Sequence, residues 1–477
     1  MERLIYDGKL PVYPAREVAF SRLGIGFEKL DRAVFDPNKA YDKVSAIGVK
    51  KIRLQSGWMR TEREKGVYDF AWLDEIVDRL LSLGMEPWLC LSYGNPLYTE
   101  FAEKVFGAVG CPPIGSEAET EAWLRYVEAT VAHFKGRISL YEIWNEPDCG
   151  YSWKHAGETK EQLDKERNAR EYGMFASVTA QSIRKADPSA KIAALAIGHI
   201  ANLKWSNDAL ATGLYRYIDY VTFHVYSSTD ARRARMITSL RDLVTSYNPD
   251  IKLIQGESGA QTRSDGNGAM KGFAWSPEKQ TKILLRTLIC DLHVGVEFTS
   301  YFSTMDMIEA LRGLVDDKAS YLDYGYFGVL SAEFDEDGRS IGTYTEKPSY
   351  YALSALASLL RGNACAEAIP YAVEELPSRR VNGTDCSDLE LQVYSFRLDD
   401  GDTAMIYWKK ANILTETYEG TATFCVYGQK TDAIRLCDLK DGTLYRLPAA
   451  MTEELGNGAV RLKNLPLTDC PLAIIFG

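Results

Sequence analysis

Two glutamates occupy positions from which they could act as a pair. Glu146 directly follows the apolar stretch 138–145, and Glu257 lies at the end of the apolar stretch 252–259. The chain has 66 acidic residues, so position rather than residue type singles these two out. Two carboxyl groups about 5 to 5.5 Å apart can cleave a glycosidic bond through a covalent intermediate. The pair indicates a retaining glycosidase if the fold brings both residues into one pocket.

The fold that could do so is visible in the alternation of short apolar and longer amphipathic stretches. The apolar stretches are mostly apolar on both faces, which is typical of parallel strands covered by helices. Between them, apolar residues recur at helical spacing, and one such helix should begin at Ser276 and Pro277. The expected strands are 23–29, 50–57, 86–93, 138–145, 191–198, 220–227, 252–259 and 296–303.

Eight strand–helix units in sequence predict an α/β fold, a (β/α)8 TIM barrel, with active residues at the carboxyl ends of the strands. The fourth and seventh strands should face one another across the mouth of this barrel. Glu146 and Glu257 would then point into one shared pocket. The stretch 347–360 is interpreted as the eighth barrel helix, displaced by an insertion with a hairpin around Asp337-Gly338.

The pattern changes after residue 361 to alternating strands broken by the turn pairs Asp400-Gly401, Asp441-Gly442 and Asn457-Gly458. This pattern predicts a C-terminal antiparallel β-sandwich. We therefore expect a catalytic barrel, an accessory sandwich, and an N-terminal segment that is free to pair with the sandwich. The expected boundaries are 1–20 for the segment, 21–361 for the barrel and 362–477 for the sandwich.

The composition narrows the classes of function. The formal charge of −11 argues against nucleic-acid binding by charge. Nine cysteines without a CxxC pair predict reduced thiols rather than a disulfide framework or zinc finger. With only five histidines, a multi-histidine metal site would need nearly all of them, and we expect no metal and no cofactor. The sequence has no long apolar run and no apolar core near residue 1, so we expect a cytoplasmic protein without membrane segments.

A family resemblance appears at the two glutamates. The segment Trp144-Asn145-Glu146-Pro147 resembles the acid/base motif of the clan A glycoside hydrolases, whose nucleophilic glutamate lies on the seventh strand. Glu257 lies 111 residues later, a spacing that fits the clan. His224 and Tyr226 on the sixth strand and Arg53 on the second occupy positions where the clan has similar residues. GIGFEKL at the first strand, the full-length barrel and the sandwich look most like family 39, the β-xylosidase and α-L-iduronidase group.

This resemblance implies a role for each of these residues. Glu257 would attack the anomeric carbon as a carboxylate, held ionised by Arg53 and by a hydrogen bond from Tyr226. Glu146 would protonate the leaving oxygen and then activate water. Asn145 would bind the sugar 2-hydroxyl, and His224 would contact the substrate or the nucleophile. The partner would be an oligosaccharide or glycoside, and the sequence leaves a homo-oligomer open.

Several aromatic residues near strand ends could stack on sugars, with plain packing as the equal alternative for each. Glu28 could bind hydroxyls of the terminal sugar, whereas Lys29 is expected to be a solvated loop residue. His155 and His199 could line the pocket. The aromatic candidates are Trp58, Tyr93, Trp144, Trp153, Trp275 and Tyr301.

Other functions remain as alternatives. The segment 256–260, GESGA, is one residue away from a nucleophile elbow around Ser258, but only His293 follows it, at the end of an expected helix. A Schiff-base aldolase would need a lysine at a strand end, and none is convincing there. An endo-acting β-glycanase of the same clan and a non-catalytic carbohydrate-binding relative also remain. The long segments 94–117, 149–166 and 261–276 favour an exo-acting enzyme such as a β-xylosidase, because they could close one end of the cleft.

Overall fold

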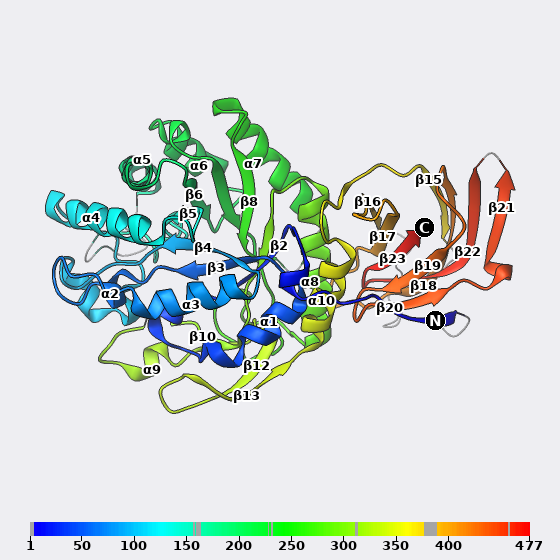
Figure 1. Ribbon diagram of the computed structural model, residues 1–477, viewed down its shortest axis with the longest axis horizontal. Helices are drawn as coiled ribbons and strands as arrows, with labels where there is room; N and C mark the ends of the chain where they lie inside the picture. Colours follow the sequence, from blue (N-terminus) through cyan, green and yellow to red (C-terminus); the bar gives the residue numbers. More distant parts are fainter. Residues whose placement is uncertain are drawn as a thin grey trace.

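The computed structural model describes residues 4–155, 158, 164–227, 229, 232–310, 313–375, 389–456 and 458–477. A helix-covered barrel occupies one end of the molecule, and two antiparallel sheets occupy the other (Figure 1). The chain begins and ends on the side of these two sheets. This arrangement is the predicted fold class.

A closed barrel of eight parallel strands forms the first part. Each of its strands falls within one of the eight expected stretches. The apolar runs at those places have the length of a single barrel strand. The strands are β2 (Leu23–Gly26), β3 (Lys51–Gln55), β4 (Glu86–Leu91), β5 (Leu140–Ile143), β6 (Lys191–Ile197), β7 (Tyr220–His224), β8 (Lys252–Glu257) and β9 (Thr299–Tyr301).

Helices surround the barrel and bury their apolar faces against it. Ser276 caps the N-terminus of its helix by accepting a hydrogen bond from the backbone N–H of Lys279, as its sequence predicts. The helices are α1 (Tyr41–Ile47), α2 (Trp58–Thr61), α3 (Ala71–Ser82), α4 (Glu117–Phe134), α5 (Lys165–Ala186), α6 (Leu203–Leu210), α7 (Arg233–Tyr247), α8 (Pro277–His293), α9 (Lys318–Tyr321) and α10 (Pro348–Leu359). Short 3-10 helices are η1 (Ala15–Glu17), η2 (Leu30–Arg32), η3 (Pro37–Lys39), η4 (Glu100–Lys104), η5 (Phe106–Ala108), η7 (Leu214–Arg216) and η8 (Ala449–Met451).

The insertion between β9 and α10 contains two small hairpins. One consists of β10 (Met307–Ile308) and β11 (Tyr324–Gly325). The other consists of β12 (Leu330–Phe334) and β13 (Ser340–Glu346), and its turn contains Asp337-Gly338 as expected. Helix α10 then completes the ring of helices, packed against α1 and α8.

The C-terminal part consists of two antiparallel sheets with their own apolar core. Turns at Asp400-Gly401 and Asp441-Gly442 join neighbouring strands as expected, whereas Asn457 lies outside the described residues. The seven-stranded sheet contains β1 (Ile5–Lys9), β20 (Thr443–Arg446), β19 (Ile434–Asp438), β23 (Leu472–Phe476), β17 (Thr403–Lys409), β16 (Leu391–Arg397) and β14 (Cys365–Ala366), in that order. The four-stranded sheet contains β15 (Tyr371–Glu375), β18 (Glu419–Tyr427), β22 (Ala459–Thr468) and β21 (Thr452–Gly456).

Several contacts attach the barrel to these sheets. Strand β1 pairs with β20, so the N-terminal segment adds an edge strand to the larger sheet. Buried Arg286 on α8 donates hydrogen bonds to the backbone carbonyls of Lys409, at 3.0 Å, and Ala411, also at 3.0 Å. Lys282, one turn earlier on α8, forms a buried ion pair of 2.8 Å with Asp469.

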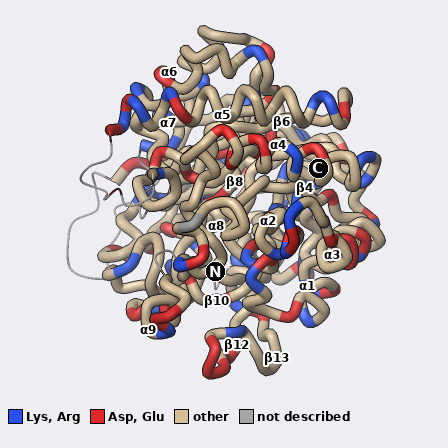
Figure 2. The backbone as a smooth tube through the Cα atoms, turned by 90° about the vertical axis from the view of Figure 1, so that its left-hand side faces the viewer, with Lys and Arg blue, Asp and Glu red and all other residues tan. Residues whose placement is uncertain are grey.

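Charged residues of both signs are interspersed over the outer helices, as Figure 2 shows from the side of the barrel. In the described part of the chain, no helix is both long and apolar enough to span a bilayer. The eight cysteines described by the structure are free thiols, and six of them are buried.

Candidate active site

A cavity of about 1200 Å³ opens at the carboxyl ends of the barrel strands, and both Glu146 and Glu257 line it. One carboxylate oxygen of each residue and a ring nitrogen of His224 all lie within 4.8 Å of one another. The two carboxyl groups are therefore close enough to act on one bond placed between them. The barrel thus brings together the two glutamates that the sequence singled out.

The backbone around Glu146 is held in an uncommon conformation. Trp144 and Glu146 have φ values of 66° and 48°, in the left-handed region that side chains disfavour. Such residues cost about 1 to 3 kcal/mol each and persist where the surroundings hold them. Here the N–H of Glu146 donates to the carbonyl of Ala196 on β6 at 3.0 Å, and that of Trp144 to Leu91 on β4 at 3.1 Å. The neighbouring strands therefore fix the direction in which Glu146 enters the cavity.

Glu257 is the last residue of β8 and receives two strong hydrogen bonds. The Arg53 guanidinium donates to one carboxylate oxygen, and the Tyr226 hydroxyl donates to the other at 2.8 Å. Burial alone would raise the pKa of Glu257, but His224, Arg53 and Tyr226 outweigh it and lower the pKa below the ordinary value. Glu257 is therefore a carboxylate at neutral pH, as a nucleophile must be.

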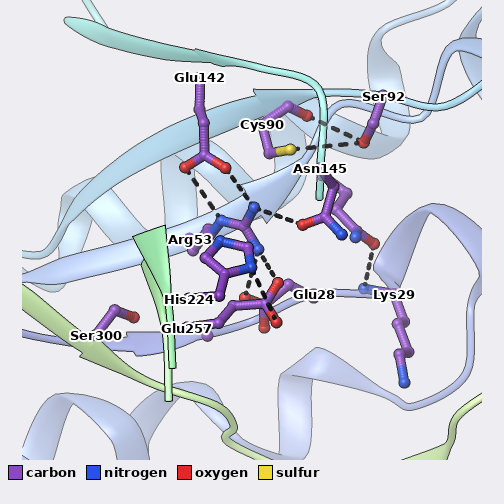
Figure 3. Close-up of polar contacts among 12 residues, drawn as sticks. Glu28, Lys29, Arg53, Cys90, Ser92, Glu142, Asn145, His224, Glu257 and Ser300 are labelled. Carbon is purple, nitrogen blue, oxygen red and sulfur yellow. Dashed lines mark hydrogen bonds and ion pairs between the residues drawn. The ribbon is translucent and has the colours of Figure 1, made fainter. Parts of the chain in front are cut away.

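Arg53 on β3 is the centre of this network (Figure 3). It is fully buried and donates from Nη2 to Asn145 Oδ1 at 2.9 Å and from Nε to Glu142 at 3.3 Å. Its Nη1 lies 3.5 Å from Glu28. One guanidinium therefore orients both Glu257 and Asn145, and it lies among three buried carboxyl groups, those of Glu28, Glu142 and Glu257.

His224, the last residue of β7, lies between the two glutamates. Its Nδ1 is 3.0 Å from Glu146 and 3.7 Å from Glu257. Burial lowers the pKa of His224, but the two carboxylates reverse this and raise it above the ordinary value. One of the two contacts expected of His224, that with Glu257, is present, and a contact with Glu146 accompanies it.

Comparisons with known proteins agree with this geometry. Residues 36–249, a little under half of the chain, match the model of the glycosyl hydrolases family 39. The β-xylosidase of Geobacillus stearothermophilus is 28% identical over 175 residues, which are 34% of this chain and 32% of that protein. The match thus spans about a third of the length of that relative. The chain therefore resembles the family 39 glycoside hydrolases of clan A.

Solved structures of family 39 share its fold. A family 39 glycoside hydrolase from the gut symbiont Bacteroides cellulosilyticus WH2 has a TM-score of 0.64 at 16% identity, covering 97% of this chain and 81% of that one. A family 39 β-xylosidase from Caulobacter crescentus has a TM-score of 0.56 at 18% identity, covering 99% of both chains. The similarity includes the barrel and the C-terminal sheets.

Several acidic residues of the site escaped the sequence analysis, and Glu142 and Glu309 are two of them. Glu142, four residues before Glu146 on β5, is fully buried and binds Arg53 and the Trp88 indole, whose Nε1 donates to it at 3.2 Å. Glu309 lines the cavity beside Lys29. Glu142 could have been found as the lone acidic residue within an apolar strand. Glu309 lies in the insertion after the last barrel strand, where the sequence gives no signal for it.

Lys29 is not the solvated loop residue that the sequence suggested. It is 6% exposed, lies 3.3 Å from Glu309 and donates to the Ile308 carbonyl at 2.8 Å. The left-handed backbone at Lys29, with φ of 65°, turns its side chain inward. Glu28 is also buried in the cavity wall, and burial, only partly offset by Arg53, raises the pKa of Glu28 to about 8. Both residues are available to bind sugar hydroxyls.

Of the two alternatives for the tryptophans and Tyr301, the structure favours packing over sugar stacking. Their rings lie in the packed layers behind the cavity wall, and the polar atoms of all but Trp153 are hydrogen-bonded within the protein. Four of these candidates are buried and donate hydrogen bonds within the protein. Trp58 donates to Glu62 at 2.6 Å and Trp144 to the Ser152 carbonyl at 2.8 Å. Trp275 donates to the Met270 carbonyl at 2.8 Å and Tyr301 to the Ala260 carbonyl at 3.3 Å. Trp153 is likewise buried, and His155 pairs with Glu171 at 3.0 Å.

Other aromatic residues line the cavity instead. Among the stacking candidates, Tyr93 alone lines the cavity. Tyr226, Phe302 and Phe327 line it as well. Tyr151, five residues after Glu146, donates to the second oxygen of that glutamate at 3.1 Å. The expected pocket residue His199 also lies in the wall.

Tyr226→Phe should reveal the hydrogen bond to the nucleophile. Without this donor the pKa of Glu257 rises, so more of it is protonated at acidic pH, and the acidic limb of the kcat/KM profile moves to higher pH. We also expect kcat/KM at neutral pH to fall about tenfold. The profile should be measured with an aryl glycoside, with Tyr215→Phe, outside the cavity lining, as the control. An unchanged acidic limb would show that Tyr226 does not act on the ionisation of Glu257.

Proposed function

We propose that this hydrolase is a retaining, exo-acting glycosidase that removes terminal sugars from β-xylosides or related β-glycosides. The observation that supports this most strongly is the approach of Glu146 and Glu257 to within 4.8 Å in a cavity at the barrel mouth. The identity of the sugar rests on the relatives named β-xylosidase. The barrel, 21–361, would carry the reaction, and 362–477 would be an accessory sandwich.

Double displacement assigns the two glutamates different tasks. The Glu257 carboxylate attacks the anomeric carbon while Glu146 gives its proton to the leaving oxygen, which produces a glycosyl ester on Glu257. Glu146, now a carboxylate, takes a proton from water, and the water oxygen attacks the anomeric carbon and releases Glu257. Tyr151 and His224, which both contact Glu146, hold it in place through these two steps.

Asn145 and the Glu28 side of the cavity would bind the sugar. Arg53 occupies the Asn145 side-chain oxygen, so the amide nitrogen is the group that donates to the 2-hydroxyl. This contact strengthens as the oxocarbenium-like state forms. Glu28, Lys29 and Glu309 line the same cavity and would bind the remaining hydroxyls of the terminal sugar.

The cavity walls support exo action over the endo-acting alternative. Each of the three long segments contributes to the lining, through Val109, Tyr151, Lys165, Met270 and Lys271. Walls from three separate loops make a pocket that admits a chain end rather than an open groove that accommodates a polymer.

Glu146→Ala should separate substrates by the quality of their leaving groups. Loss of the acid should slow a glycoside with a poorly leaving alcohol by about 10³-fold, but the first step on a dinitrophenyl glycoside by only about tenfold. Values of kcat/KM on the two substrates, which report the first step, would measure this difference, with Glu128→Ala on α4 as the control. Equal losses on both substrates would remove the role of Glu146 as the acid.

A panel of α- and β-aryl glycosides tests the proposal as a whole. We expect hydrolysis of β-xyloside or a related β-glycoside, with the β-anomer of the free sugar as the first product seen by proton NMR. On a xylo-oligosaccharide, single sugars should appear before shorter oligomers. An α-anomer as first product would contradict retention, internal cleavage would favour the endo-acting alternative, and no turnover would favour a binding protein.

A further inference from the structure

Three side chains of metal-binding type meet in the cavity wall beside Glu146. Asp148 and Cys149 follow the WNEP segment after β5, and His199 follows β6. Nδ1 of His199 lies 3.1 Å from Asp148 Oδ2 and 3.5 Å from Cys149 Sγ, and this sulfur lies 3.8 Å from Asp148 Oδ1. The proposed hydrolysis uses none of these three residues.

Their spacing is that of ligands around one tetrahedral ion. Zinc binds imidazole nitrogen and carboxylate oxygen at about 2.0 to 2.2 Å and thiolate sulfur at about 2.3 Å, which places the ligand atoms about 3.3 to 3.7 Å apart. In the structure one ligand atom from each residue lies within 4.8 Å of the other two, and Asp148 approaches His199 with Oδ2, at 3.1 Å, and Cys149 with Oδ1, at 3.8 Å. A cation could therefore replace the present hydrogen bonds with only small movements of the three side chains.

Backbone hydrogen bonds fix the positions of Asp148 and Cys149, and the side chain of His199 is accessible to solvent. The backbone N–H groups of Gly198 and His199 donate to the two oxygens of Asp148 at 2.8 and 2.9 Å, which fixes the carboxylate as outer hydrogen bonds do in metal sites. The N–H of Cys149 donates to the Glu146 carbonyl at 3.0 Å. The His199 side chain is 65% exposed, so ions can enter from solution.

We propose that Asp148, Cys149 and His199 bind a thiophilic divalent cation of the zinc class, and that this cation inhibits the enzyme. One sulfur, one nitrogen and one oxygen favour Zn²⁺ over Mg²⁺ or Ca²⁺, which prefer oxygen ligands. The fourth position of the ion is left for water or a substrate oxygen.

Inhibition follows from the place of the site and rests on the proposed function. A Cβ atom on Gly198 would lie 2.8 Å from Cys149 Sγ and 3.2 Å from the Glu146 carboxyl carbon, so the thiol and the proposed acid border the same small space. A cation there would attract the Glu146 carboxyl group away from the leaving oxygen and occupy room that the leaving group needs.

Cobalt binding tests the site without any measurement of activity. Co²⁺ added to the metal-free full-length chain should give a thiolate-to-cobalt charge-transfer band that saturates near one equivalent and disappears when Zn²⁺ is added. Cys149→Ser should abolish the band, and His199→Gln should weaken Co²⁺ binding by about 100-fold. The controls, Cys365→Ser and His155→Gln, carry the same residue types outside the cluster and should bind Co²⁺ as the parent does. No band, or a band that survives Cys149→Ser, would overturn the site.

Inhibition is tested on the same proteins, each relative to its own metal-free rate. Zn²⁺ should inhibit the parent at the concentration at which it displaces Co²⁺, a chelator should reverse this, and Cys149→Ser should resist it. Binding without inhibition would overturn the inhibitory role. If the metal-free parent hydrolyses no glycoside, the proposed function fails, while the cobalt band still decides the site.

Discussion

Glu257→Ala is expected to lower kcat on an aryl β-xyloside by about 10⁵-fold, because it removes the carboxylate proposed to form the glycosyl intermediate. Arg53, Tyr226 and His224 all contact this carboxylate and hold it ionised. In the variant they border an empty space the size of a small anion, next to positive charge. Added azide should enter this space, attack the anomeric carbon from the same side and restore turnover, with the glycosyl azide of inverted configuration as product.

Glu297→Ala is the matched control. Glu297 pairs with Lys252 near the amino ends of the barrel strands, on a partly exposed side chain. Rates should be measured with and without azide by release of the aryl alcohol, and the product anomer by NMR. A Glu257→Ala variant with the parent rate, or one that azide does not rescue while the fold is intact, would remove Glu257 from the role of nucleophile.

Arg53→Met is expected to lower the free energy of unfolding by about 3 to 5 kcal/mol and to cripple hydrolysis. The substitution leaves Glu28, Glu142 and Glu257 buried around an apolar side chain. Breaking such a network is costly because negative charge then stays buried without a compensating positive charge. By contrast Arg170→Ala, which removes an exposed pair with Glu166, should cost less than about 1 kcal/mol.

The loss in Arg53→Met should depend on pH. With Arg53 present, the pKa of Glu257 is lowered, so this carboxylate stabilises the fold above its unfolded pKa. Without Arg53 the buried carboxyl groups have raised pKa values and favour the fold only while protonated. The difference in unfolding free energy between parent and variant should therefore grow from about pH 5 to about pH 8. Urea unfolding at several pH values measures it, and a difference below about 1 kcal/mol throughout would contradict the central role of Arg53.

The sequence was sufficient for those features that depend on local pattern and on barrel symmetry. Apolar runs of strand length placed all eight barrel strands, and the position of Glu146 and Glu257 at two strand ends predicted that they meet. Arg53, His224 and Tyr226 came from the resemblance to clan A, and they meet the two glutamates because side chains near the carboxyl ends of barrel strands converge on one mouth.

Features that depend on backbone detail or on distant partners could not be predicted in this way. The left-handed backbone at Trp144 and Lys29 determines the direction of their side chains. Neither tryptophan nor lysine is a residue type that predicts this backbone conformation. Lys29 meets Glu309 only because the insertion after β9 folds back over the mouth. Nothing near residue 149 indicates that His199 will lie beside Cys149, since this contact depends on how the turns after β5 and β6 approach each other.

The most direct test of the proposed reaction is to trap its intermediate. A 2-deoxy-2-fluoro-β-xyloside with a dinitrophenolate leaving group should inactivate the enzyme, since fluorine slows the second step more than the first. Mass spectrometry of the intact chain and of its peptides should then find one fluoro-sugar, attached to Glu257. A label on another residue, or hydrolysis with inversion and no label, would contradict double displacement through Glu257.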